Sequence, residues 1–184
     1  MVKLNKIYTR SGDDGNSGLV DGSRAKKSDP RFAAIGDVDE ANAAVGLAIA
    51  HLSATAPARA LLQGVQNDLF DVGADLATPG DVEGSLRITA AATERLETAI
   101  DTLTAELGPL TSFVLPGGAD AAARLHLART IVRRAERTVV ALADSQPPNP
   151  EILRYLNRLS DLLFQLARDQ NDHGASDVLW TPGG

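Results

Sequence analysis

The 184-residue chain contains no cysteine, which excludes disulfide bonds, thiolate metal ligands and cysteine nucleophiles. Aromatic residues make up only 4% of the sequence, so the core must be built mainly from Ala, Leu, Val and Ile. No apolar run approaches the roughly 20 residues that cross a bilayer, and the N-terminus has no apolar signal-like stretch. We therefore expect a cytoplasmic protein that makes no contact with a membrane.

Basic residues are also few: the chain has 18 Lys and Arg against 24 Asp and Glu, which gives a net charge of −6. This balance disfavours binding to nucleic acid or to an anionic membrane surface. A bound anion would need a local basic patch. The hydrophobic fraction of 43% and the charged fraction of 23% are typical of one globular domain.

Helical spacing of apolar residues dominates the chain after Pro30. It predicts five helices, over about residues 31–53, 57–77, 89–107, 119–144 and 150–172. Thr89 is expected to cap the third helix, and Asn42 and Asp75 are expected on outer faces. No stretch shows sustained strand alternation. The sequence thus predicts an all-α, antiparallel five-helix bundle with a non-helical N-terminal arm.

We expect one domain over residues 1–184. Residues 1–30 would form the arm, 31–173 the bundle and 174–184 a tail. The tail carries the only tryptophan, Trp180, to which the sequence assigns no role.

The fourth helical stretch carries a basic ridge of His126, Arg129, Arg133 and Arg137. At 100° per residue these side chains fall within a stripe about 80° wide, opposite the apolar stripe and with Glu136 at its border. A guanidinium group can donate two parallel hydrogen bonds to a phosphate group, and it stays charged in any surroundings. A solvated face that pairs with acidic neighbours is the alternative explanation.

Two other segments combine features of a ligand site. Residues 9–18 are rich in glycine and hydroxyl groups, which suits an anion-binding turn, and Lys27 follows; a mobile polar arm is the alternative. Phe113 precedes a Pro-Gly-Gly turn and could form the wall of a ligand pocket or plug the end of the bundle.

Several catalytic arrangements are missing. His51, His126 and His173 are far apart, and no Glu-x-x-His pair exists, which disfavours a ferritin-like di-iron centre. The Gly-x-Ser-x-Gly elbow of hydrolases is absent. General acid–base hydrolysis therefore has no evident set of residues.

Six fragments occur in one order along the chain: residues 6–15, 27–31, 36–40, 113–118, 126–137 and 155–161. In this order the sequence resembles the PduO-type ATP:cob(I)alamin adenosyltransferases. Asn16, Ser17, Ser28 and Ala41 depart from residues common in that family.

This resemblance implies transfer of the 5′-deoxyadenosyl group of ATP to cob(I)alamin, giving adenosylcobalamin and triphosphate. It implies a homotrimer with sites between subunits and Mg²⁺ held mainly by the ATP phosphates, near Glu136. A reductase and an adenosylcobalamin-dependent acceptor enzyme are the implied protein partners. A non-catalytic ATP-binding regulatory bundle and a structural helical oligomer are the alternatives.

The resemblance also implies residue roles by matching position. The implied catalytic set is Asp39, Phe113, Arg129 and Arg133, with Asp39 pairing with Arg129 across the subunit interface and Phe113 lying under the corrin ring. The implied ligand-binding set is Thr9, Arg10, Ser11, Gly12, Gly15, Ser17, Lys27, Arg133, Glu136, Arg137, Asn157 and Phe164.

Overall fold

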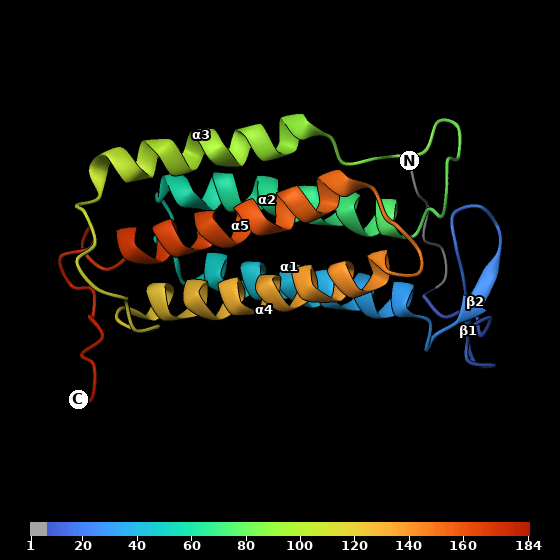
Figure 1. Ribbon diagram of the computed structural model, residues 1–184, viewed down its shortest axis with the longest axis horizontal. Coiled ribbons are helices and arrows are strands. Elements are labelled where there is room, and N and C mark those ends of the chain that lie inside the picture. The colour runs from blue at the N-terminus through green and yellow to red at the C-terminus, as the bar shows by residue number, and fades with distance from the viewer. Residues whose placement is uncertain (1–6) are drawn as a thin grey trace.

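The computed structural model describes residues 7–184 and confirms the five-helix bundle. Its helices are α1 (Pro30–His51), α2 (Pro57–Leu76), α3 (Ala90–Glu106), α4 (Asp120–Ala143) and α5 (Pro150–Asp169). Helix α1 packs against α2 and α4, while α5 packs against α3 and α4. Figure 1 shows the five helices side by side along one long axis, so the bundle has two distinct ends.

Local sequence signals set the helix boundaries. Three helices begin at a proline, whose fixed φ suits the first helical turn and whose missing N–H is not needed there. Asp29 and Asn149 cap α1 and α5 by accepting hydrogen bonds from backbone N–H groups two residues ahead. Thr89 lies at the predicted N-cap of α3, although its side chain makes no capping hydrogen bond.

The core consists almost entirely of small and branched aliphatic side chains, as the low aromatic content requires. Tyr155 of α5 is fully buried, and its hydroxyl donates to the Asp68 carboxylate over 3.1 Å. Burial and the Asp68 charge raise the pKa of this hydroxyl, so Tyr155 remains a neutral donor.

Two polar side chains that were expected on outer faces are buried instead. Asn42 of α1 donates to the backbone carbonyl of Gln66 in α2 over 3.1 Å. Asp75 of α2 is 1% exposed and accepts from Arg87 Nη1 at 2.6 Å, from the backbone N–H of Ile88 at 2.9 Å, and from Asn149 Nδ2 at 2.8 Å. Helical spacing does not reveal the loops that cover these positions.

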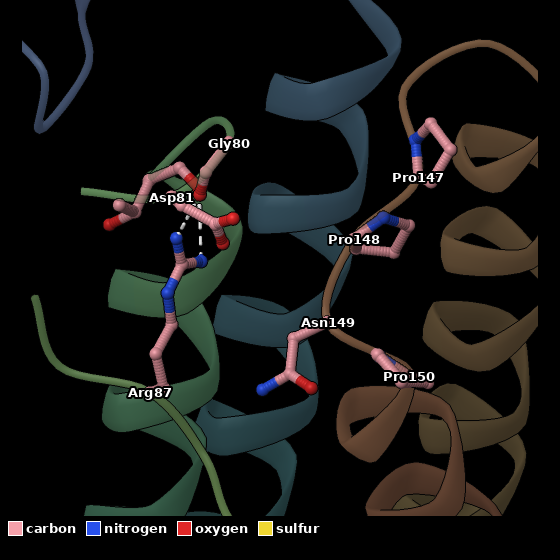
Figure 2. Close-up of a pocket in the computed structure, with 8 residues that line it drawn as sticks. Gly80, Asp81, Arg87, Pro147, Pro148, Asn149 and Pro150 are labelled. Atoms are coloured by element: carbon pink, nitrogen blue, oxygen red, sulfur yellow. Dashed lines mark hydrogen bonds between the residues drawn. The ribbon is translucent and has the colours of Figure 1, made fainter. Parts of the chain in front are cut away.

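A pocket of about 400 Å³ adjoins this carboxylate, between the loop after α2 and the loop before α5. Figure 2 shows Arg87 and Gly80 on one side of the pocket and the Pro147–Pro150 segment on the opposite side. Arg87 donates to the carbonyls of Thr78 and Gly80 as well as to Asp75. The hydrogen bonds of Arg87 and Asn149 thus join both loops to Asp75 at this end of the bundle.

The arm contains a hairpin that was not predicted, because three-residue strands are too short to show alternation. Strands β1 (Asn16–Gly18) and β2 (Arg24–Lys26) pair antiparallel, with Ser17 opposite Ala25. The Val20 N–H donates to the Ala77 carbonyl over 2.9 Å and ties the hairpin to the end of α2. The first six residues of the predicted arm lie outside the described residues.

Within residues 7–184, no helix is both long and apolar enough to span a bilayer.

Candidate functional site

A mostly apolar pocket of about 790 Å³ lies over α5, between α3 and α4 and under the loop that joins them. The loop contributes Phe113, α4 contributes Arg129, and α5 contributes Asp161 and Phe164. The remaining lining residues are Ile100, Leu110, Ser112, Val114, Pro116, His126, Thr130 and Gln165. Phe113 is 77% exposed, so it forms a pocket wall, and the alternative of a plug in the bundle end is wrong.

Three side chains meet in the wall of this pocket. The Arg129 guanidinium lies over the Phe164 ring at 5.4 Å from its centroid. The His126 ring meets the same phenyl ring edge-on, with centroids 6.1 Å apart. The fold thus brings Phe113, Arg129 and Phe164, which are far apart in the sequence, into the lining of one pocket.

The structure corrects the predicted basic ridge at its first member. His126 is 3% exposed, Arg129 is half-buried, and Arg133 and Arg137 face solvent. Burial lowers the pKa of His126, and the Arg129 charge lowers it further against an opposing effect of Asp177. His126 is thus a neutral imidazole at pH 7. Burial and the Arg133 charge also lower the pKa of Arg129, which nevertheless stays protonated.

A second pocket of about 420 Å³ follows along α5. In it, Asn157 Nδ2 donates to Glu136 Oε1 over 2.8 Å, so these two predicted residues are in direct contact. Arg158 spans the boundary between the pockets, since it pairs with Glu97 at 3.0 Å and with Asp161 at 2.7 Å. The two pockets therefore lie next to each other along α5, with the ion-paired Arg158 between them.

The arm gathers the predicted hydroxyl, glycine and ammonium groups in a compact turn. The Thr9 and Ser11 hydroxyls are 2.7 Å apart, and Gly15 adopts a φ of +80° that favours glycine. A β-carbon on Gly12 would lie 3.0 Å from Lys27 Nζ, so glycine permits this approach. The arrangement supports the interpretation of the arm as an anion-binding turn.

The predicted residues do not all meet within one chain. Figure 1 shows the hairpin and the Phe113 loop at opposite ends of the bundle, whose 24-residue helix α4 is about 36 Å long. Asp39 is exposed on α1 and makes no ion pair within residues 7–184, whereas its neighbours Asp37 and Glu40 pair with Arg134. A single chain therefore does not bring the arm residues and the Phe113 pocket together.

Comparison with known proteins identifies the family. A sequence model described as cobalamin adenosyltransferase matches residues 7–170. The chain belongs to the cobalamin adenosyltransferase family. It is similar to a corrinoid adenosyltransferase of Mycobacterium tuberculosis H37Rv, with 51% identity that covers 100% of this chain and 96% of the relative.

Two further comparisons place the fold and length within the same family. A corrinoid adenosyltransferase of Bacillus subtilis is 46% identical over 94% of this chain and 91% of its own. A phenylalanine-to-alanine variant of a PduO-type ATP:corrinoid adenosyltransferase from Lactobacillus reuteri was solved with cobalamin and ATP. Its structure is 40% identical, with a TM-score of 0.89, and the match covers 95% of this chain and 99% of that one.

Sequence reasoning missed the contacts of the tail. Trp180 meets Phe113 edge-on, with ring centroids 5.9 Å apart, and Asp177 pairs with Arg168 near the end of α5. No periodic pattern marks these positions. A lone tryptophan in a chain so poor in aromatics was the one available signal.

Proposed function

We propose that this member of the family transfers the 5′-deoxyadenosyl group of ATP to the cobalt of cob(I)alamin and releases triphosphate. Family membership makes the protein a corrinoid adenosyltransferase and disfavours a purely structural or regulatory bundle. The observation that carries the assignment to a site is the 790 Å³ pocket, which joins Phe113, Arg129 and Phe164 and lies next to the pocket that holds the Glu136–Asn157 pair.

The pocket suits a corrinoid because the pocket is large and its lining is mostly apolar. A corrin ring placed against Phe113 would meet a hydrocarbon face with no atom able to ligate cobalt. Without a lower axial ligand, the electron-rich +1 state of cobalt is stabilised relative to +2. Phe164 supports this wall from α5, and the neutral His126 beside it adds no positive charge.

The nucleotide suits the polar part of the site. We assign the triphosphate to the arm residues Thr9, Arg10, Ser11, Gly12, Gly15, Ser17 and Lys27, together with Arg133 and Arg137 of α4. Glu136 and Asn157 would complete the nucleotide site through their hydrogen-bonded pair. Guanidinium and ammonium groups stabilise the charge that grows on the leaving triphosphate.

Magnesium fits this arrangement as a companion of ATP. Residues 7–184 contain no group of three or more side chains placed to hold a metal ion, so its ligands would come mainly from phosphate oxygens, near Glu136. When bound, Mg²⁺ offsets part of the triphosphate charge.

The separation of the arm from the Phe113 loop supports a shared site. We propose a homotrimer in which the arm of one subunit meets the pocket of the next, with the exposed Asp39 paired to Arg129 across the interface. Asp39 is free to do so because Asp37 and Glu40, not Asp39, bind Arg134 within the chain.

The proposed reaction needs no general base. The electron pair of cobalt(I) forms the new bond to the 5′ carbon, the carbon–oxygen bond breaks, and its electrons leave with triphosphate. Cobalt becomes formally +3. The protein aligns the two reactants, which is worth about 7–11 kcal/mol in favourable cases. A reductase would supply cobalt(I), and an adenosylcobalamin-dependent enzyme would accept the product, both in the cytoplasm.

An anaerobic assay with chemically reduced cobalamin and ATP tests this function. We expect the cobalt–carbon product spectrum to appear together with one triphosphate per product. Binding of ATP without triphosphate release would support a regulatory bundle, and the absence of any ATP-dependent thermal shift would support a structural oligomer.

A further inference from the structure

We propose that Arg168, Asn171 and Asp177 form a tail anchor that positions the Phe113 loop for the transfer reaction. The inference rests on the proposed function, since it concerns the residue that we place under the corrin ring. All three anchor residues were without a role in the sequence, and two of them lie beyond the 7–170 match to the family. We assign them as positioning residues, because none lines the corrinoid pocket.

The tail anchor is a buried ion pair with an amide beside it. Arg168 Nε donates to Asp177 Oδ2 over 2.9 Å, and the two side chains are only 7% and 3% exposed. Asn171 Nδ2 donates to Asp177 Oδ1 over 3.2 Å, so both carboxylate oxygens are engaged. Breaking such a pair leaves a buried charge without compensation, which makes its opening costly.

The same side chains hold both ends of the loop between α3 and α4. Arg168 Nη2 donates to the Gly108 carbonyl over 3.0 Å, where the loop leaves α3. Asn171 donates to the Gly117 carbonyl over 3.2 Å and accepts from the Ala119 N–H over 2.9 Å, where the loop enters α4. The tail anchor therefore fixes both ends of the loop that contains Phe113.

From Asp177 the tail runs along the middle of this loop as a short antiparallel bridge. The Leu115 N–H donates to the Val178 carbonyl over 2.7 Å, and the Trp180 N–H donates to the Phe113 carbonyl over 2.8 Å. Ser112 Oγ donates to the Trp180 carbonyl over 2.8 Å. The Trp180 ring then meets the Phe113 ring edge-on.

Phe113 needs such support because the core does not hold it. Its side chain is 77% exposed, so packing leaves the ring free on most sides. The backbone bonds to the tail and the Trp180 ring supply the missing constraint. Loss of the anchor should therefore displace the ring without disturbing the residues assigned to ATP, since none of them is hydrogen-bonded to the anchor.

The test uses Asp177→Asn in the full-length protein, with Asp172→Asn as a matched control. Asp172 is exposed in the turn just before the tail, at a φ of +55° that asparagine also adopts readily. Trp180 is the only tryptophan, so its emission and its quenching by acrylamide report tail docking directly. Turnover with cob(I)alamin is measured in parallel as kcat and as KM for ATP.

We expect Asp177→Asn to raise acrylamide quenching of Trp180 and to lower kcat by roughly ten- to hundredfold, as for a misplaced catalytic group, with KM for ATP nearly unchanged. The Asp172→Asn control should match the original protein in both readouts. A released Trp180 with unchanged kcat would overturn the proposal, and so would an equal loss in kcat and in ATP affinity.

A double variant keeps the test decisive if Asp177→Asn does not fold. Arg168→Met with Asp177→Leu removes both charges, and such replacements are often tolerated. The same quenching and kcat changes are expected, because the link to Gly108 and the link to Asn171 are both lost. Inactivity of the unmodified protein would refute the proposed function, and increased quenching of Trp180 would still show that the anchor docks the tail.

Discussion

Replacing Phe113 by alanine should separate activity from stability. A buried phenylalanine truncated to alanine costs about 3–5 kcal/mol, but Phe113 is 77% exposed and leaves no cavity in the core. Its main packing contact is the edge-on pair with Trp180, and aromatic pairs are worth about 0.5–1.5 kcal/mol. We therefore expect a loss of about 1 kcal/mol, which for a chain of this length is a Tm decrease of about 2–4 °C.

The rate of adenosylation should respond far more strongly. Without the ring, the lower face of the corrin is open to water or another ligand, and the +1 state loses its stabilisation. We expect the rate to fall by about ten- to hundredfold, the size of effect that misplacement of a reacting group produces. The Kd for ATP should change little, since we assign the triphosphate to the arm and to Arg133 and Arg137, none of which lines the Phe113 pocket.

The assay combines anaerobic single-turnover kinetics, calorimetric titration with ATP and thermal unfolding. Phe70→Ala is the matched control, because Phe70 is 71% exposed on α2, away from the pocket. Equal losses in rate and in ATP affinity would refute the role of Phe113 under the corrin. A Tm decrease of more than about 5 °C would show that the ring stabilises the fold more than its exposure allows.

Three further outcomes follow from the site and the bundle. Arg129→Ala should weaken both trimer formation and cobalamin binding; a variant that stays trimeric with unchanged cobalamin affinity argues against pairing with Asp39. Asp75→Ala should lower the free energy of unfolding by about 3–5 kcal/mol in denaturant titrations, because its buried carboxylate accepts three hydrogen bonds, whereas Asp81→Ala, on the exposed loop, should have little effect. Burial lowers the pKa of His126 below 6.5, so the unfolded chain takes up a proton first as the pH falls. Stability should decrease below about pH 6.5, and His126→Asn should flatten this decrease in unfolding measurements between pH 5 and pH 7; an unchanged slope contradicts the burial of a neutral imidazole.

The helices were predictable because each carries one continuous apolar stripe, and because prolines mark three of their starts. The hairpin of the arm was not, since its strands are shorter than one full alternation. Helical spacing also placed His126, Asn42 and Asp75 on outer faces. A helical wheel shows which side of a helix is apolar, but it does not show which loops and neighbouring helices cover the remaining sides.

Three of the residues that line the pocket were named from the sequence, because Phe113 and Arg129 stand in stretches with a family pattern and Phe164 lies just after another. The tail anchor escaped detection for a physical reason. Arg168 and Asp177 meet because Asp172, His173 and Gly174, which all have a positive φ, turn the chain back on the end of α5. No repeat or spacing rule connects residues across such a turn.

The central claim is that the arm of one subunit and the pocket of another form each site. Two variants of reduced activity test it most directly: Lys27→Ala, which impairs the arm, and Phe113→Ala, which impairs the pocket. When the two are unfolded, mixed and refolded together, shared sites predict that about a quarter of the sites combine an intact arm with an intact pocket and regain adenosylation. A mixture that is no more active than its separate components would contradict the account.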